Sequence, residues 1–393
     1  MTPPARFAVI TGSGVVSPLG STLADFFDGL VAGRSAIAPI RRFRADDLDP
    51  AAAAEIVDDE DGDTDRVGAF AVRAARRALD AAMLQPDGLD PARVGVVLGT
   101  TLGGMEIFEG WDRSLTGEDR PTAPLGRVPY FAAAARVAGV IGARGPVMTP
   151  QLACASGTAA VALAADWVRA GRADVVLAGG SDILCRFVVA GFNCLHATAP
   201  VARPFDRDRR GLVLGEGAAV VVVEDAKHAA RRGARAWARV LGTGAAADAV
   251  HMTAPDREGG GVVRAVDAAL ADAGVSPSAV DFVSAHGTGT PFNDAMEAHA
   301  LVRIFGERAV PVNSIKGAIG HTLGAAGAFE AALCAEVLAR GVIPPTAGLE
   351  EIDPECAGLD LVRGEARAGP IRVAVSTSSG FAGANAALVL GDG

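Results

Sequence analysis

The sequence is poor in lysine, cysteine and aromatic residues. Lys227 and Lys316 are the only lysines among 36 basic residues, so arginine is the usual cation. The five cysteines are odd in number and form no CxxC pair, which argues against a disulfide framework or a zinc site and favours a reducing cytoplasm. No uncharged apolar stretch of about 18 residues occurs, so we expect no membrane span. The apolar run at the N-terminus is too short for a signal peptide.

The chain has 393 residues, of which 50% are hydrophobic, and its net charge is −10. This composition is typical of a soluble globular protein with a large core, arranged as two domains or as one duplicated domain. Because the net charge is negative and no broad basic surface is implied, we expect no nucleic-acid partner.

Short β-rich apolar runs alternate with alanine-rich helical stretches, a pattern that predicts an α/β fold with helices covering mixed sheets. The expected strands are Phe7–Thr11, Val94–Leu98, Val147–Gln151, Asp174–Ala178, Ala218–Glu224, Asp281–Ala285, Val310–Asn313, Arg372–Ser376 and Ala386–Leu390. The expected helices include Arg66–Met83, Ser156–Ala170, Gly260–Ala273, Asp294–Ile304 and Leu323–Arg340. The pattern is weakest near Gly233–Asp248, so we divide the chain there into halves of residues 1–240 and 241–393.

Cys154 lies in the segment QLACASGT, on the turn between an expected strand and an expected helix, with small residues on both sides. A nucleophile on such a turn needs small neighbours, because the backbone bends sharply and the substrate comes close. The N-terminus of the following helix would favour a thiolate and would also bind an oxyanion. The alternative is an ordinary buried cysteine.

Two of the six histidines lie in glycine-rich loops after expected strands. His286 opens HGTGTPFND, and His321 lies in NSIKGAIGHTLGAAG. A histidine near a helix N-terminus is biased toward its neutral form, which can donate a hydrogen bond to a developing enolate oxygen. Two such groups beside a cysteine suit a reaction that passes through a carbanion. The alternative for either histidine is a structural residue.

Two further features surround these loops. Lys316 precedes His321, and Glu330 follows it within the expected helix, so a buried Lys–Glu pair with a positioning role is one interpretation and an exposed lysine is the other. Near the C-terminus, RVAVSTSSGFAGANAALVL predicts two strands joined by a glycine-rich turn. Phe381 on that turn is a candidate gate whose N–H could complete an oxyanion hole with that of Cys154. The alternative is a hairpin with one packing aromatic residue.

Four segments, in this order, resemble the β-ketoacyl-[acyl carrier protein] synthase II family of thiolase-superfamily condensing enzymes, which includes the catalytic ketosynthase subunits of type II polyketide and polyene systems. They are ACASG, HGTGTPFND, SIKGAIGHTLGAAG and GFAGAN. The resemblance covers nearly the whole chain. It implies a fold of two βαβαβαββ halves that form a five-layered αβαβα core, and an obligate dimer, either a homodimer or a heterodimer with a subunit of the chain-length-factor type.

The resemblance also implies roles for the residues in these segments. Cys154 would accept an acyl group from acyl carrier protein, and His286 and His321 would support decarboxylation of a malonyl thioester. Lys316 and Glu330 would organise the site, and the N–H groups of Cys154 and Phe381 would hold the oxyanion. Thr288 and Thr290 would line the tunnel for phosphopantetheine, which belongs to the carrier protein. The resemblance implies no metal and no cofactor bound by the enzyme itself.

Differences from the family pattern bear on the pathway. GFAGAN replaces the GFGGTN of housekeeping enzymes, and Phe292 stands where a smaller residue is usual. These changes favour a specialised pathway over housekeeping fatty-acid synthesis. Two alternatives are a non-decarboxylating thiolase, which needs a second cysteine in a C-terminal CxG setting, and a non-catalytic partner subunit, which would lack Cys154 or a histidine.

An acidic carrier protein usually docks on a small basic patch near the tunnel mouth. On the expected helix Arg66–Met83, helical spacing places Arg66, Arg73 and Arg77 near one face. We therefore take these three arginines as candidate docking residues, with an ordinary solvated face as the alternative.

Overall fold

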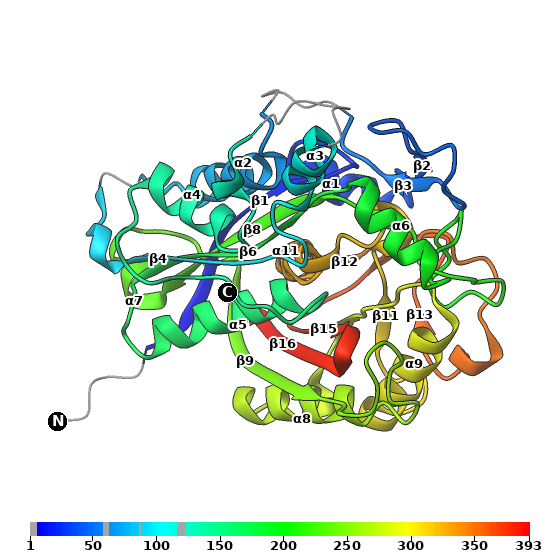
Figure 1. Cartoon of the computed structure of the whole chain (residues 1–393). Coiled ribbons are helices and arrows are strands. Elements are labelled where there is room, and N and C mark those ends of the chain that lie inside the picture. The colour runs from blue at the N-terminus through cyan, green and yellow to red at the C-terminus, as the bar shows by residue number, and fades with distance from the viewer. Residues whose placement is uncertain (1–5, 58–62, 86–87, 116–122) are drawn as a thin grey trace.

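The computed structural model describes residues 6–57, 63–85, 88–115 and 123–393. Within these residues, eleven strands form one mixed sheet in the order β13-β11-β10-β15-β16-β9-β1-β8-β6-β4-β5. The sheet consists of two halves with the same strand order, joined where β1 and β9 pair over a short stretch (Figure 1).

The first half has the order β5-β4-β6-β8-β1. Its strands are β1 (Ala8–Val16), β4 (Val94–Gly99), β5 (Val147–Met148), β6 (Val175–Asp182) and β8 (Gly217–Asp225). Strand β4 pairs in parallel with β5 and β6, whereas β8 is antiparallel to both β6 and β1.

The second half repeats this arrangement in the order β11-β10-β15-β16-β9. Its strands are β9 (Ala238–Ala247), β10 (Phe282–Ser284), β11 (Pro311–Asn313), β15 (Val373–Gly380) and β16 (Ala384–Asp392). Strand β10 is parallel to β11 and β15, and β16 is antiparallel to both β15 and β9. The equivalent order and direction of the strands confirm the predicted duplication.

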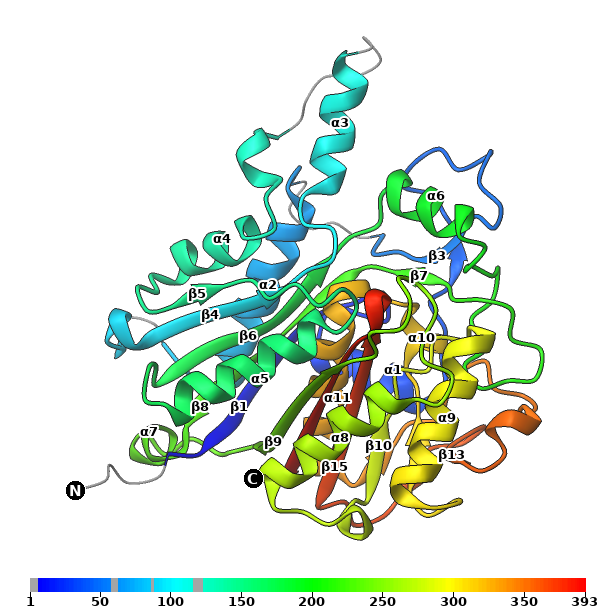
Figure 2. The same ribbon diagram turned by 60° about the horizontal axis from the view of Figure 1, so that its bottom comes forward.

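Each half carries three helices at equivalent places in its strand sequence. They are α2 (Arg66–Ala81), α4 (Ala132–Ile141) and α5 (Ser156–Arg169) in the first half, and α8 (Gly260–Ala273), α9 (Pro291–Phe305) and α11 (Ala326–Arg340) in the second. Helices α2 and α4 cover one outer face, α8 and α9 cover the other, and α5 and α11 lie between the two halves of the sheet (Figure 2). This is the predicted five-layered αβαβα core.

The remaining helices and strands are short and lie mostly at the edges of these layers. They are α1 (Leu23–Val31), α3 (Met105–Leu115), α6 (Arg186–Cys194), α7 (Ala226–Arg231), α10 (Lys316–Ile319), β2 (Ala38–Pro39), β3 (Ala52–Ala54), β7 (Leu214–Gly215), β12 (Val342–Ile343), β13 (Asp360–Leu361) and β14 (Arg367–Ala368). Helix α3 projects away from the layered body (Figure 2). Across the described ranges, no helix combines the length and the apolar character that crossing a bilayer requires.

Small residues let the two helices of the middle layer pack closely. A Cβ atom at Gly157 of α5 would lie 2.7 Å from the backbone nitrogen of Ala328 in α11, so only glycine fits. Helix α11 is buried over nearly its whole length, as expected for a helix covered on both sides by sheets. This packing brings the N-terminal ends of α5 and α11 together, and with them the segments that contain Cys154 and His321.

Strand β9 corrects the sequence analysis, which treated 233–248 as the weakest part of the pattern. Its sequence, ARVLGTGAAA, has little strand propensity, because glycine and alanine are depleted in strands. The strand forms because it pairs with β16 along its length. Its glycines have a packing role, since a Cβ atom at Gly244 would lie 2.0 Å from the carbonyl oxygen of Ala265 in α8. The expected boundary at residue 240 falls inside this strand.

Candidate active site

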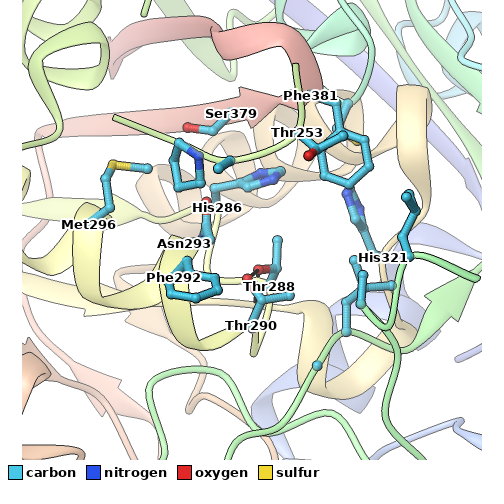
Figure 3. A pocket seen from close by; sticks show the side chains of 18 of the residues that line it. Thr253, His286, Thr288, Thr290, Phe292, Asn293, Met296, His321, Ser379 and Phe381 are labelled. Carbon is cyan, nitrogen blue, oxygen red and sulfur yellow. Dashed lines mark hydrogen bonds between the residues drawn. The ribbon is translucent and has the colours of Figure 1, made fainter. Parts of the chain in front are cut away.

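A cavity of about 360 Å³ opens between the two halves of the molecule. Cys154, His286, His321 and Phe381 all line it, although they come from four separate segments. Figure 3 shows the two histidines and Phe381 around this cavity. Among the described residues, no group of three or more His, Cys, Asp or Glu side chains is placed to hold a metal ion.

Cys154 lies just before α5, where the preceding Ala153 has a left-handed φ of 48°. The sharp turn predicted from the small residues is therefore present. The thiol is almost fully buried, with 5% of the residue exposed. Burial raises the pKa of Cys154 to about 12, although the positive charge of Lys316 opposes the shift. The Cys154 side chain is thus a neutral thiol at neutral pH, and it would have to lose its proton in order to act as a nucleophile.

His286 and His321 face each other edge-on, with 5.2 Å between their ring centroids. Burial, and then the charge of Lys316, lowers the pKa of both rings well below the usual value, so both are neutral at neutral pH. The Nδ1 atom of each ring has no hydrogen-bond partner within the described residues. The tautomer of each ring is therefore not fixed by a hydrogen bond from its Nδ1 atom to another described residue.

The ammonium of Lys316 is buried, and its charge acts on both rings. It donates hydrogen bonds to the carbonyl oxygen of His286 and to Oε1 of Glu330, the latter at 2.6 Å. Ser378 donates to the second carboxylate oxygen of Glu330 at 3.0 Å. Burial raises the pKa of Glu330, while Lys316 opposes that shift. The exposed-lysine alternative is wrong, because Lys316 and Glu330 are 2% and 1% exposed.

Two buried carboxylates on α9 hold the loop that begins with His286, and the sequence analysis missed both of them. Glu297 accepts hydrogen bonds from the backbone N–H groups of His286 and Gly287, both at 2.7 Å. Asp294 accepts from those of Thr288 and Gly289. Acidic residues three positions apart share a helix face, so the sequence HGTGTPFNDAME contained a usable signal.

Asp182, at the end of β6, is a third buried carboxylate that the sequence did not reveal. It accepts hydrogen bonds from the hydroxyl of Thr100 at 2.7 Å and from the backbone N–H of Gly324 at 2.7 Å. Burial raises its pKa to about 6. Asp182 thereby connects the loop after β4 to the segment that follows His321. No local pattern indicates this role, because its partners lie far away in the sequence.

The β15–β16 hairpin places Phe381 beside Cys154. A Cβ atom at Gly380 would lie 2.8 Å from the carbonyl oxygen of Leu152 and 3.2 Å from the nitrogen of Cys154, so the two backbones are in contact. The ring of Phe381 stacks on Phe192, with 5.6 Å between the ring centroids.

The turn of this hairpin is strained at one residue and tied to a neighbouring loop. Ala382 has a left-handed φ of 64°, which is strained for a residue with a side chain. Its backbone N–H donates to the carbonyl oxygen of Met252 at 2.7 Å. Phe381 therefore lies on a turn that is tied to a second loop.

Thr288 and Thr290 line the same cavity on the wall below the histidines (Figure 3). Their hydroxyl groups are 2.9 Å apart and share a hydrogen bond. Phe292 continues this wall and is 65% exposed. The wall therefore carries hydroxyl groups deep in the cavity and an aromatic ring at its solvent side.

The expected docking face on α2 needs a correction. Arg66 is 4% exposed and forms a two-pronged ion pair with the buried Glu216, at 2.8 and 2.9 Å. Arg73 and Arg77 are partly buried, and Arg77 donates to the carbonyl oxygen of Val15. The prediction that Arg66 belongs to an exposed basic patch is wrong, because helical spacing does not reveal which face of α2 packs on the sheet.

Comparison with protein families gives two matches. Residues 6–229 match the family model "Beta-ketoacyl synthase, N-terminal domain", and residues 237–350 match "Beta-ketoacyl synthase, C-terminal domain".

Individual proteins are similar over nearly the whole chain. The 3-oxoacyl-[acyl-carrier-protein] synthase 2 of Coxiella burnetii is 38% identical, covering 98% of each chain. The tetracenomycin polyketide synthase ketoacyl synthase alpha subunit of Streptomyces glaucescens is 41% identical, covering 97% of this chain and 96% of that one. The solved structure of the ishigamide ketosynthase/chain length factor matches with a TM-score of 0.94 and 38% identity, over 99% of this chain and 100% of that chain. This chain belongs to the β-ketoacyl synthase family.

Proposed function

We propose that this protein is a β-ketoacyl-[acyl carrier protein] synthase that extends acyl chains by decarboxylative Claisen condensation in a type II polyketide, polyene or fatty-acid system. The observation that carries the proposal is a single cavity lined by one buried cysteine and two neutral histidines. The substrates would be thioesters on the phosphopantetheine arm of acyl carrier protein.

The first half-reaction loads Cys154. The sulfur attacks the carbonyl carbon of an acyl thioester, its proton passes to the leaving thiolate of the carrier, and the acyl group remains on Cys154. Because the thiol pKa is raised, loss of the proton must accompany attack. The backbone N–H groups of Cys154 and Phe381, whose chain segments are in contact at Gly380, would hold the tetrahedral oxyanion.

The second half-reaction uses the two histidines. A malonyl thioester loses carbon dioxide, and the electron pair of the broken C–C bond moves into an enolate whose oxygen accepts hydrogen bonds from neutral His286 and His321. The enolate carbon then attacks the acyl-Cys154 carbonyl, and collapse of the tetrahedral intermediate releases the Cys154 thiolate, which takes up a proton from solvent to regenerate the resting thiol. A neutral imidazole suits this step, because an imidazolium would lose its proton to the enolate more readily.

Lys316 and Glu330 have a positioning role in this proposal. Lys316 is bonded to the backbone of His286 and to Glu330 on α11, so it connects the two loops that carry the histidines. Thr288 and Thr290 would hydrogen-bond the amide groups of pantetheine.

The alternatives have less support. A thiolase needs a second cysteine at the site, yet Cys154 is the only cysteine among the described residues that line the cavity. A non-catalytic partner subunit would lack part of the Cys–His–His set, which is complete here. The strained Ala382 and the exposed Phe292 favour a specialised pathway, because both alter the surroundings of the cavity.

We also propose a dimer, either a homodimer or a heterodimer with a chain-length-factor subunit. Strand β5 is the outermost strand of its half, and Val147 and Met148 on it are 42% and 49% exposed. Such an apolar sheet edge invites pairing with a second chain. Native mass, measured with and without a candidate partner subunit, distinguishes the two kinds of dimer.

Intact mass spectrometry tests the proposed chemistry. The protein is incubated with acyl carrier protein thioesters of several chain lengths and then with malonyl carrier protein. Wild type should gain one acyl group and then release a chain that is two carbons longer, whereas Cys154→Ala should gain none. An acyl adduct that persists in Cys154→Ala would refute the mechanism.

A further inference from the structure

Four arginines lie in the segment 203–210, and three of them face carboxylates. The pairs are Arg203–Glu350 at 3.4 Å, Arg207–Glu351 at 2.6 Å and Arg209–Asp353 at 2.5 Å. The fourth, Arg210, is exposed and has no carboxylate within ion-pair distance in the described part of the chain. It also differs from the other three by lining the cavity.

The position of Arg210 relative to the threonine wall follows from the backbone. The next residue, Gly211, packs against the His286 loop, since a Cβ atom at Gly289 would lie 3.1 Å from the carbonyl oxygen of Gly211. Gly289 is flanked by Thr288 and Thr290. Arg210 therefore lies beside the threonine wall at its solvent side, where a bound arm would leave the cavity.

His196 lies on the neighbouring segment and also lines the cavity. The two segments run in parallel, with a bridge between Thr198 and Leu212 and a hydrogen bond from the N–H of Leu212 to the carbonyl oxygen of Ala197 at 2.8 Å. His196 is exposed. The mouth of the cavity thus has a guanidinium and an imidazole on adjacent segments.

A carboxylate also lines the cavity, but it already has partners. Asp248 accepts hydrogen bonds from Nδ2 of Asn385 at 2.8 Å and from the backbone N–H of Asp256 at 3.1 Å. No ion pair joins Asp248 to Arg210 within the described residues. The guanidinium can therefore receive an external anion without first breaking an internal ion pair.

We infer that Arg210, assisted by His196, binds the phosphodiester of the phosphopantetheine arm at the mouth of the cavity. This inference rests on the proposed function. The arm has neutral amide groups and a reactive thioester at its inner end, and its only charge is the phosphodiester at its outer end. A planar guanidinium binds two phosphate oxygens at once, which also orients the arm.

The test compares two donors that differ only in the phosphate, acyl-phosphopantetheine and acyl-pantetheine, both free of carrier protein. The rate of Cys154 acylation is followed by intact mass. Wild type should react faster with the phosphorylated donor by about tenfold, the effect of one charge-assisted contact at a partly exposed site. Arg210→Ala should lose this preference and keep the wild-type rate with acyl-pantetheine. Added salt should reduce the preference of wild type.

Arg207→Ala is the matched control, because it removes an exposed arginine from the same segment and should keep the preference. Equal rates for the two donors in wild type would overturn the inference and leave the proposed function intact. A preference that survives in Arg210→Ala would also overturn it. If Arg210→Ala lowers the acylation rate equally with both donors, Arg210 has a structural role and the inference is overturned. Failure of wild type to react with either donor and also with acyl carrier protein thioesters would reject the proposed function itself.

Discussion

The ammonium of Lys316 donates a hydrogen bond to the backbone carbonyl oxygen of His286, thirty positions earlier in the chain. The same ammonium is bound to Glu330 on α11, the helix that follows His321. One buried cation therefore fixes the loop of one histidine relative to the helix that positions the other.

Replacing Lys316 with methionine should lower both stability and activity. The change leaves Glu330 buried without its cation, at a cost of at most about 3–5 kcal/mol, and proton uptake by Glu330 should reduce that cost. The double variant Lys316→Met/Glu330→Gln should recover part of the stability. Its decarboxylation of malonyl carrier protein should stay low, because His286 still lacks its donor. Urea unfolding and carbon dioxide release measure the two effects. If the double variant recovers activity together with stability, Lys316 and Glu330 have only a structural role.

Stability should fall below pH 6.5 because of the two buried histidines. Folding lowers the pKa of His286 and His321, so below about pH 6.5 the unfolded chain binds protons that the folded protein does not. Each histidine should contribute a loss of about 1.4 kcal/mol per pH unit in that range.

Glu297 and Asp182 have pKa values raised to about 7 and about 6, so the folded protein binds their protons more readily than the unfolded chain does. Their contribution to stability therefore increases as the pH falls, opposite to that of the histidines. The measurement is therefore the difference between wild type and His286→Asn in urea unfolding at several pH values. The stability gap should narrow as the pH falls from 7.5 to about 5.5, the range below the ordinary histidine pKa. A gap independent of pH would show that His286 is not buried in its neutral form.

The contact at Gly380 should control acylation of Cys154. In Gly380→Ala the new methyl group would meet the carbonyl oxygen of Leu152 at 2.8 Å, so the hairpin must shift and move the N–H of Phe381. Loss of one oxyanion donor should slow acylation by about 10²-fold. Gly369→Ala is the control, because its Cβ would meet nothing within 4 Å. Single-turnover acylation, followed by intact mass, measures the rate. Equal rates in the two variants would remove Phe381 from the proposed oxyanion hole.

Arg66→Ala should destabilise the fold and leave carrier-protein recognition unchanged. It breaks a buried ion pair with Glu216, which also accepts hydrogen bonds from the backbone N–H groups of Ile56 and Leu184. The expected cost in unfolding free energy is about 3–5 kcal/mol. Arg76→Ala, at an exposed position on the same helix, should change the unfolding free energy by no more than about 0.5 kcal/mol. A raised KM for the carrier protein without a loss of stability would restore the docking role of Arg66.

The sequence predicted most of the fold, because long amphipathic helices and apolar strands have strong periodic patterns. Helix α8 was predicted with its observed bounds, and α5 to within one residue. Strand β9 was missed, because its alanines and glycines favour neither state and its pairing with β16 forms over a long separation in the chain. The buried carboxylates Glu297 and Asp182 were missed for a similar reason, since burial depends on the packing of distant elements.

By itself, the sequence identified the candidate reactive groups, which are one cysteine on a tight turn, two histidines in glycine-rich loops and a lysine between them. These are local features, set by backbone requirements within a few residues of each group. The tertiary structure alone decided which groups meet and in what state. Burial made both histidines neutral and raised the thiol pKa, and packing of α2 withdrew Arg66 from the surface. Desolvation and distant ion pairs cause these effects, and they exist only once the layers are assembled.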